Sequence, residues 1–142
     1  LINTSEFSNK RQTMAHRLGP WICQCGIGLI IPVPLHTSRK RKRGYNQAEW
    51  IAKGISDVLH IPVDTHTLYR VRRTKPQKKL NDIERKQNLQ GAFSVKCALP
   101  PNASILLVDD IYTTGSTVDE AARCLQAAGE CKVYVAAVAI GG

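Results

Sequence analysis

An apolar run that leads directly into two adjacent acids is the feature that most constrains this chain. Residues 105–108 are all apolar, Asp109 and Asp110 follow, and a turn rich in hydroxyl side chains surrounds Gly115. A short, continuous apolar run of this kind is typical of a strand buried on both faces in a parallel sheet. In open parallel sheets, ligands bind beyond the carboxyl ends of the strands. The sequence therefore predicts that both acids lie at the ligand-binding edge of an α/β fold.

The rest of the chain alternates in the way that a mostly parallel sheet flanked by helices requires. We expect a loop over Asp109–Gly115, a helix that Ser116 caps and Gly129 ends, and a last strand over 133–140. The earlier elements are expected as a strand at 28–34, a helix capped by Asn46 and ending near His60, a strand at 63–71, a basic loop at 72–79, a short helix capped by Asn81 or Asp82, and a strand at 92–95.

Length and charge narrow the class of protein. A chain of 142 residues is expected to form one main domain, here 28–142, preceded by a polar segment at 1–27 that has no assigned role and whose pattern over 7–21 allows a helix. No apolar run approaches the roughly 20 residues that span a bilayer, and no signal-peptide pattern is present, so we expect a cytoplasmic protein. The net charge of +9 predicts anionic partners, either phosphates or nucleic acid.

The five cysteines do not have the spacing of a metal site. Cys23 and Cys25 are separated by a single residue, and a tetrahedral zinc site requires two pairs, usually with wider spacing. We expect reduced thiols in core or surface positions and predict no zinc.

The turn after the two acids is suited to binding an anion. Residues 112–117 bring backbone amides and four Ser/Thr hydroxyls to a helix N-terminus, where the dipole favours negative charge. Because Asp109 and Asp110 would repel a phosphate, they must contact a different part of the ligand, such as vicinal hydroxyls or a hydrated Mg²⁺. A ribose 5-phosphate satisfies both requirements. The alternative is that the acids only complement the helix dipole, which contributes about 0.3–1 kcal/mol per charge.

Several motifs resemble those of a known family. Ile105-Leu-Leu-Val-Asp-Asp-Ile-Tyr-Thr-Thr-Gly-Ser-Thr117 is similar to the phosphoribosyl pyrophosphate (PRPP) signature of type I phosphoribosyltransferases. Three further stretches resemble the ComF family, whose members are associated with DNA uptake in naturally competent bacteria: Ile31-Pro-Val-Pro-Leu-His36, Arg43-Gly-Tyr-Asn-Gln-Ala-Glu49, and Arg73-Thr-Lys-Pro-Gln77 with Asn88-Leu-Gln-Gly-Ala-Phe93. Longer members carry an N-terminal zinc module of four cysteines, which this chain lacks.

The resemblance implies a type I phosphoribosyltransferase-like fold and Mg²⁺-dependent transfer of a 5-phosphoribosyl group from PRPP to an acceptor, with release of pyrophosphate. It implies that Asp109 and Asp110 hold the ribose hydroxyls and the Mg²⁺. It assigns the 5-phosphate to Thr113, Thr114, Gly115, Ser116 and Thr117. It assigns the pyrophosphate loop to Pro34, Leu35, His36 and Thr37, and a flexible loop over the site to Arg72, Arg73, Lys75, Gln77 and Arg85. Arg73 and Lys75 are expected to act in catalysis together with the two acids.

Two other functions remain open at this point. The basic runs at 39–43 and 70–79 also suit single-stranded DNA, although few aromatic side chains are interleaved with the cations. A regulator that binds PRPP without chemistry would carry the same motif. The acceptor and the oligomeric state are not encoded in any pattern that we recognise.

Overall fold

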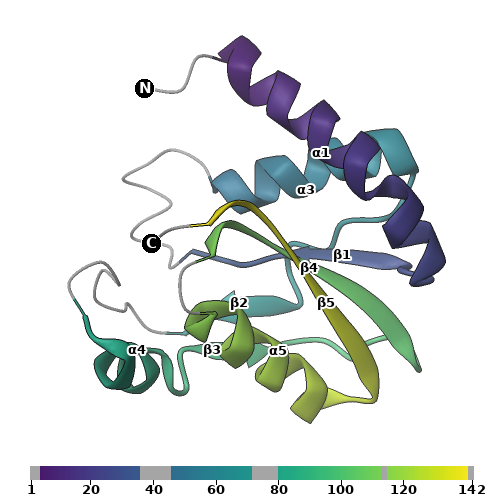
Figure 1. Cartoon of the computed structure of the whole chain (residues 1–142). Helices are drawn as coiled ribbons and strands as arrows, with labels where there is room; N and C mark the ends of the chain where they lie inside the picture. The colour runs from purple at the N-terminus through teal and green to yellow at the C-terminus, as the bar shows by residue number, and fades with distance from the viewer. Residues whose placement is uncertain (1–3, 36–45, 72–79, 113–114, 141–142) are drawn as a thin grey trace.

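The computed structural model describes residues 4–35, 46–71, 80–112 and 115–140. Its centre is a three-stranded parallel sheet with the order β1-β4-β5, formed by Leu29–Pro32, Ala103–Tyr112 and Cys131–Ile140 (Figure 1). Beside β1, Val63 adds a single parallel bridge to Ile30. The second sheet is an antiparallel pair of short strands, β2 (Leu68–Arg70) and β3 (Phe93–Val95). The predicted α/β fold with a mostly parallel sheet is confirmed.

Helices α1 (Thr4–Gln24) and α3 (Gln47–Leu59) cover one face of the parallel sheet (Figure 1). The core on this face joins residues of both helices to alternate residues of β4. Its members include Ala15, Ile22, Ile51, Ile55, Leu106 and Val108. The helix that the pattern over 7–21 allowed is therefore present and longer than expected. The division of the chain into 1–27 and 28–142 stays a prediction.

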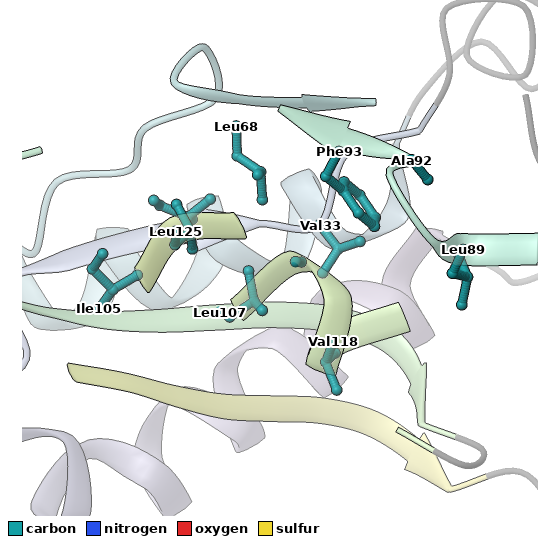
Figure 2. Close-up of a cluster of buried hydrophobic side chains, with 11 residues drawn as sticks. Val33, Leu68, Leu89, Ala92, Phe93, Ile105, Leu107, Val118 and Leu125 are labelled. Atoms are coloured by element: carbon teal, nitrogen blue, oxygen red, sulfur yellow. The ribbon is translucent and has the colours of Figure 1, made fainter. Parts of the chain in front are cut away.

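Helix α5 (Ser116–Ala128) and the two-stranded β2–β3 sheet cover the opposite face, and α4 (Asp82–Leu89) lies beside α5 (Figure 1). Figure 2 shows the second core there, in which side chains of β2 and β3, of β4 and of α5 converge. This core contains Val33, Leu68, Phe93, Ile105, Leu107 and Val118. Since β4 contributes alternate residues to the two cores, it is buried on both faces, as its unbroken apolar run predicted.

Two predicted elements differ from the structure. The expected strand at 63–71 is a strand only from Leu68, because the Asp64 carboxylate accepts hydrogen bonds from the backbone N–H groups of His66 and Thr67, both at 2.9 Å, and so forms a turn. The strand before the acids is also longer than expected: β4 continues to Tyr112 because β5 pairs with it as far as Ile140. The expected loop at 109–115 is therefore wrong for its first four residues.

The helix boundaries follow from capping. Asn46 caps α3, as predicted, since its Oδ1 accepts the backbone N–H of Ala48 at 3.0 Å. Asn81 caps α4 through the N–H of Glu84 at 2.9 Å. The expected cap at Ser116 is wrong: Gly115 occupies that position without a side-chain hydrogen bond, and Ser116 is the first helical residue. Within the described residues, no helix is both long and apolar enough to cross a membrane.

Candidate functional site

The two acids lie at the carboxyl edge of the sheet, immediately beyond the last paired residue of β1. Pro32 pairs with Val108 in the parallel register, and the N–H of Val33 donates to the carbonyl oxygen of Val108 at 2.8 Å. Asp109 and Asp110 follow, with only β5 continuing beside them. Because β1 ends there while β4 continues, both carboxylates border a step in the edge of the sheet.

Asp109 follows Leu107 by two residues, so it lies on the face covered by α5 and by the β2–β3 sheet. The side chain of Asp110 hydrogen-bonds that of Asp109, so the two carboxyl groups lie close together. Asp109 is only 9% exposed, and Asp110 is partly exposed. The N–H of Asp110 donates to Oδ1 of Asp109 at 2.8 Å, which fixes one oxygen of the buried carboxylate.

Burial and the neighbouring acid both disfavour the charge on Asp109. Burial is the larger cause, and a side-chain hydrogen bond and the negative charge of Asp110 add to it, so the pKa of Asp109 is raised from 3.8 to about 7. The backbone N–H of Asp110 and the positive charge of Arg70 act in the opposite direction. A carboxyl group that titrates near neutrality at a sheet edge is typical of a functional site.

The turn after β4 is built around Gly115. This residue has φ of 83° and ψ of 0°, a left-handed conformation that a residue with a Cβ rarely adopts. It opens α5, and its carbonyl oxygen accepts the N–H of Asp119 at 2.8 Å. Ser116 and Thr117 form the first turn of that helix, where backbone N–H groups lack partners within the helix. Thr113 and Thr114 lie outside the described residues.

The predicted pyrophosphate loop begins next to the acids. Pro34 and Leu35 follow Val33 and are half-buried, whereas His36 and Thr37 lie outside the described residues. Asn46, on the far side of that gap, donates from Nδ2 to the carbonyl oxygen of Val33 at 3.1 Å. The buried side-chain amide of Asn46 therefore connects the residue that follows this segment to the end of β1.

The predicted flexible loop falls mostly on positions that the structure does not describe. Arg72, Arg73, Lys75 and Gln77 lie outside the described residues. Arg85 lies in α4 and forms an ion pair with Asp82 at 3.8 Å. A role for these five residues stays a prediction.

Arg70 is the residue of this region that the sequence reading missed. It is the last residue of β2 and pairs with Phe93 in the antiparallel register. Its guanidinium carbon lies 4.8 Å from the centre of the Phe93 ring. The period of the strand carries a signal for it, since an arginine two residues after buried Leu68 faces the same side. The sequence prediction counts Arg70 only as part of the basic run at 70–79.

Asp109 and Asp110 fit the requirements of a Mg²⁺ that is held mainly by a ligand. Both offer hard oxygen donors, and Mg²⁺ usually binds one or two carboxylates together with water and substrate phosphates. Among the residues that the structure describes, no three His, Cys, Asp or Glu side chains gather as a metal site. The donor set thus suits an ion that arrives with a diphosphate. All five cysteines are free thiols.

Comparison with known proteins agrees with this geometry. The sequence model of the family described as phosphoribosyl transferase domain matches residues 14–141. The chain is 40% identical over 108 residues to Competence protein F of Haemophilus influenzae, which covers 75% of this chain and 47% of that protein. It is 37% identical over 106 residues to the DNA utilization protein YhgH of Escherichia coli, with 75% of this chain and 46% of that protein covered.

Competence protein ComFC of Bacillus subtilis is 35% identical over 102 residues, which are 72% of this chain and 40% of that protein. The chain therefore spans less than half the length of these curated relatives. The names of these relatives confirm the resemblance to the ComF family.

Among solved structures, adenine phosphoribosyltransferase from Saccharomyces cerevisiae superposes with a TM-score of 0.65 at 13% identity, covering 98% of this chain and 70% of that one. Purine phosphoribosyltransferase from Pyrococcus horikoshii superposes with a TM-score of 0.59 at 14% identity, covering 98% and 76%. At such identities the likeness concerns the fold, and the predicted type I phosphoribosyltransferase-like fold is confirmed. By its sequence and its fold, this chain belongs to the phosphoribosyl transferase domain family.

Proposed function

We propose that this protein binds PRPP together with Mg²⁺ and transfers its 5-phosphoribosyl group to an acceptor, releasing pyrophosphate, in a cytoplasmic process linked to DNA uptake or use. The observation that carries the proposal is the placement of Asp109 and Asp110 at the carboxyl edge of β4, directly before the anion-binding turn at Gly115. The names of the relatives, which refer to competence and DNA utilization, support the process.

The residues of the site divide the ligand between them. Carboxylate oxygens of Asp109 and Asp110 accept hydrogen bonds from the ribose 2- and 3-hydroxyls, and N–H groups of the turn at 115–117 donate to the 5-phosphate. The same two carboxylates would hold Mg²⁺ through water, and the ion, when bound, offsets the negative charge of the diphosphate. This division explains why two acids can lie beside an anion site without repelling its phosphate.

The reaction exchanges one bond at the ribose C1 carbon. The bond from C1 to the diphosphate oxygen breaks, the electron pair leaves with pyrophosphate, and a lone pair of the acceptor forms the new bond to C1. Water must be kept away from C1, because it would otherwise compete with the acceptor. We assign this exclusion, and the stabilisation of the leaving group, to the segment with Arg72, Arg73, Lys75, Gln77 and Arg85.

Calorimetric titration with PRPP and Mg²⁺ tests the proposal. Native protein should bind PRPP, and the double variant Asp109→Asn/Asp110→Asn should lose at least tenfold in affinity without any decrease in its melting temperature. The matched control is Asp57→Asn/Glu130→Gln, which also removes two negative charges, from exposed positions on α3 and after α5. Equal PRPP affinity in the native protein and the aspartate variant would refute the assignment.

Pyrophosphate release then separates an enzyme from a sensor. Native protein is incubated with PRPP and Mg²⁺ and with ammonia or each common nucleobase as acceptor. Release that depends on an acceptor and disappears in the aspartate variant supports transfer. Tight PRPP binding without release for any acceptor of this panel would favour a regulator that only senses the ligand.

Single-stranded DNA is the second candidate partner. Lys86 and Arg123 line a surface pocket of about 620 Å³ between α4 and α5, and the chain carries a net charge of +9. The described aromatic rings offer little for base stacking: Phe93 is buried, and Trp21 packs edge-on against Tyr134 with ring centres 5.7 Å apart. Binding that is absent at about 50 mM salt, or that does not weaken as salt is added, would exclude this partner.

A further inference from the structure

The two-stranded β2–β3 sheet carries Arg70, whose positive charge acts on Asp109 at the carboxyl edge of the parallel sheet. Arg70 and Phe93 are directly opposite in the antiparallel register, so their side chains lie on the same face of the β2–β3 sheet. That face carries Leu68 and Val95, which pack in the core under α5. Arg70 therefore leaves the sheet on its buried face, and the residue as a whole is partly exposed.

Phe93 provides the surface on which Arg70 rests. Phe93 is 6% exposed and belongs to the same core as Val33 and Leu107, and Figure 2 shows Val33 beside its ring. The guanidinium carbon lies 4.8 Å from the ring centre, a distance typical of a cation–π contact. Since Leu107 precedes Asp109 by two residues on the same face of β4, this contact brings the guanidinium toward Asp109. Arg70 and Asp109 interact electrostatically, as expected from this placement.

The segment that leads into β2 lies beside β1. The segment before β2 pairs with the outer side of β1 through Ile30 and Val63, away from β4. Helix α5 packs against β3 as well as against β4 and β5. Arg70 thus lies on the strand that follows the bridge to β1, and its partner strand β3 lies beside α5.

We propose that Arg70, fixed on the ring of Phe93, is a binding residue for the diphosphate of the phosphoribosyl ligand. This inference rests on the proposed function and adds a residue to it. A planar guanidinium keeps its charge at every accessible pH and can bind two phosphate oxygens at once. Its charge also reduces the repulsion between the diphosphate and the carboxylates of Asp109 and Asp110.

Three ligands and two substitutions of Arg70 separate this role from a general effect on the site. Arg70→Gln should weaken binding of PRPP and of inorganic pyrophosphate, each with Mg²⁺, by about tenfold or more. Binding of ribose 5-phosphate should change by less than about threefold, because that ligand lacks the diphosphate. Arg70→Lys should give an intermediate loss for pyrophosphate, since lysine keeps the charge but lacks the planar fork.

Lys96→Gln is the matched control. Lys96 follows β3 and stacks on Tyr69 of β2, with its Nζ 4.3 Å from the ring centre. This pair lies on the face of the β2–β3 sheet opposite Leu68 and Phe93. The substitution removes the same charge from the same kind of contact, and all three affinities should stay within about threefold of native. The melting temperatures of Arg70→Gln and Lys96→Gln show whether the β2–β3 sheet is intact.

The outcomes are distinct. If native protein binds all three ligands and Arg70→Gln binds pyrophosphate as Lys96→Gln does, Arg70 is not a diphosphate residue and the proposed function is unaffected. If Arg70→Gln weakens ribose 5-phosphate as much as pyrophosphate, the diphosphate assignment is wrong. Native protein that binds none of the three contradicts the proposed function and the Arg70 site together.

Discussion

The side chain of Asn46 joins the start of α3 to the end of β1. Its Nδ2 donates to the carbonyl oxygen of Val33 at 3.1 Å, while its Oδ1 accepts the N–H of Ala48 at 3.0 Å. The residue is 7% exposed, so neither hydrogen bond is readily replaced by water. The arrangement needs a donor and an acceptor that point to different partners, and the amide of asparagine provides them on two separate atoms.

Asn46→Asp should therefore destabilise the protein although aspartate is a good N-cap. The new carboxylate keeps the acceptor for Ala48 but places a second acceptor against the Val33 carbonyl. We expect the free energy of unfolding, measured in urea, to fall by about 2 kcal/mol. Asn81→Asp is the control, because exposed Asn81 only accepts a hydrogen bond, from Glu84, and should change stability little. Equal effects of the two substitutions would contradict a donor role for Asn46.

Asp109→Asn should stabilise the protein at neutral and alkaline pH. The pKa of Asp109 is raised from 3.8 to about 7, chiefly by burial and then by Asp110, so the native state keeps a proton that the unfolded chain loses. The free energy of unfolding of the native protein accordingly falls as the pH rises through this window, and the loss is complete above it. The variant should gain about 4 kcal/mol at about pH 8 and almost nothing below about pH 4. Urea unfolding across this range measures the difference, and a gain that does not depend on pH would contradict the cause.

The affinity for PRPP and Mg²⁺ should increase with pH through the same range. Protonated Asp109 cannot accept hydrogen bonds from the ribose at both oxygens and has no charge to attract the cation. Affinity should therefore rise up to about tenfold between about pH 6 and pH 8, by calorimetry. The phosphates of PRPP titrate as well, so their contribution is measured in the free ligand by phosphorus NMR and subtracted. A profile that the ligand alone explains would remove Asp109 as the cause.

Gly115→Ala should weaken both the fold and the anion site. The φ of 83° at Gly115 is unfavourable for alanine, and the substitution should cost about 1 kcal/mol or more in the free energy of unfolding. Because the turn carries the amides of 115–117, ribose 5-phosphate should also bind less tightly. Gly28→Ala is the control, since its added Cβ meets no atom within 4 Å and its φ is not in the left-handed region. Loss of stability at position 28 and not at 115 would overturn this explanation.

Local patterns in the sequence were sufficient for the elements that make the edge of the sheet. The apolar run at 105–108 is continuous because β4 is buried on both faces, and a strand of this kind has few alternatives. Gly115 follows because the chain must turn with a positive φ. The N-cap at Asn46 was readable because a short polar side chain before an apolar helical pattern satisfies the free amides of the first turn.

Contacts between distant segments decided the rest. β4 continues past the acids because β5 runs beside it, and Asp109 resists ionisation chiefly because the β2–β3 sheet and α5 cover that face of the sheet, with Asp110 adding to the effect. Asn46 reaches Val33, 13 residues earlier, and Arg70 is held by a ring on β3. A linear pattern gives the period and the caps of each element, whereas burial and charge coupling depend on which faces meet, and packing alone sets that.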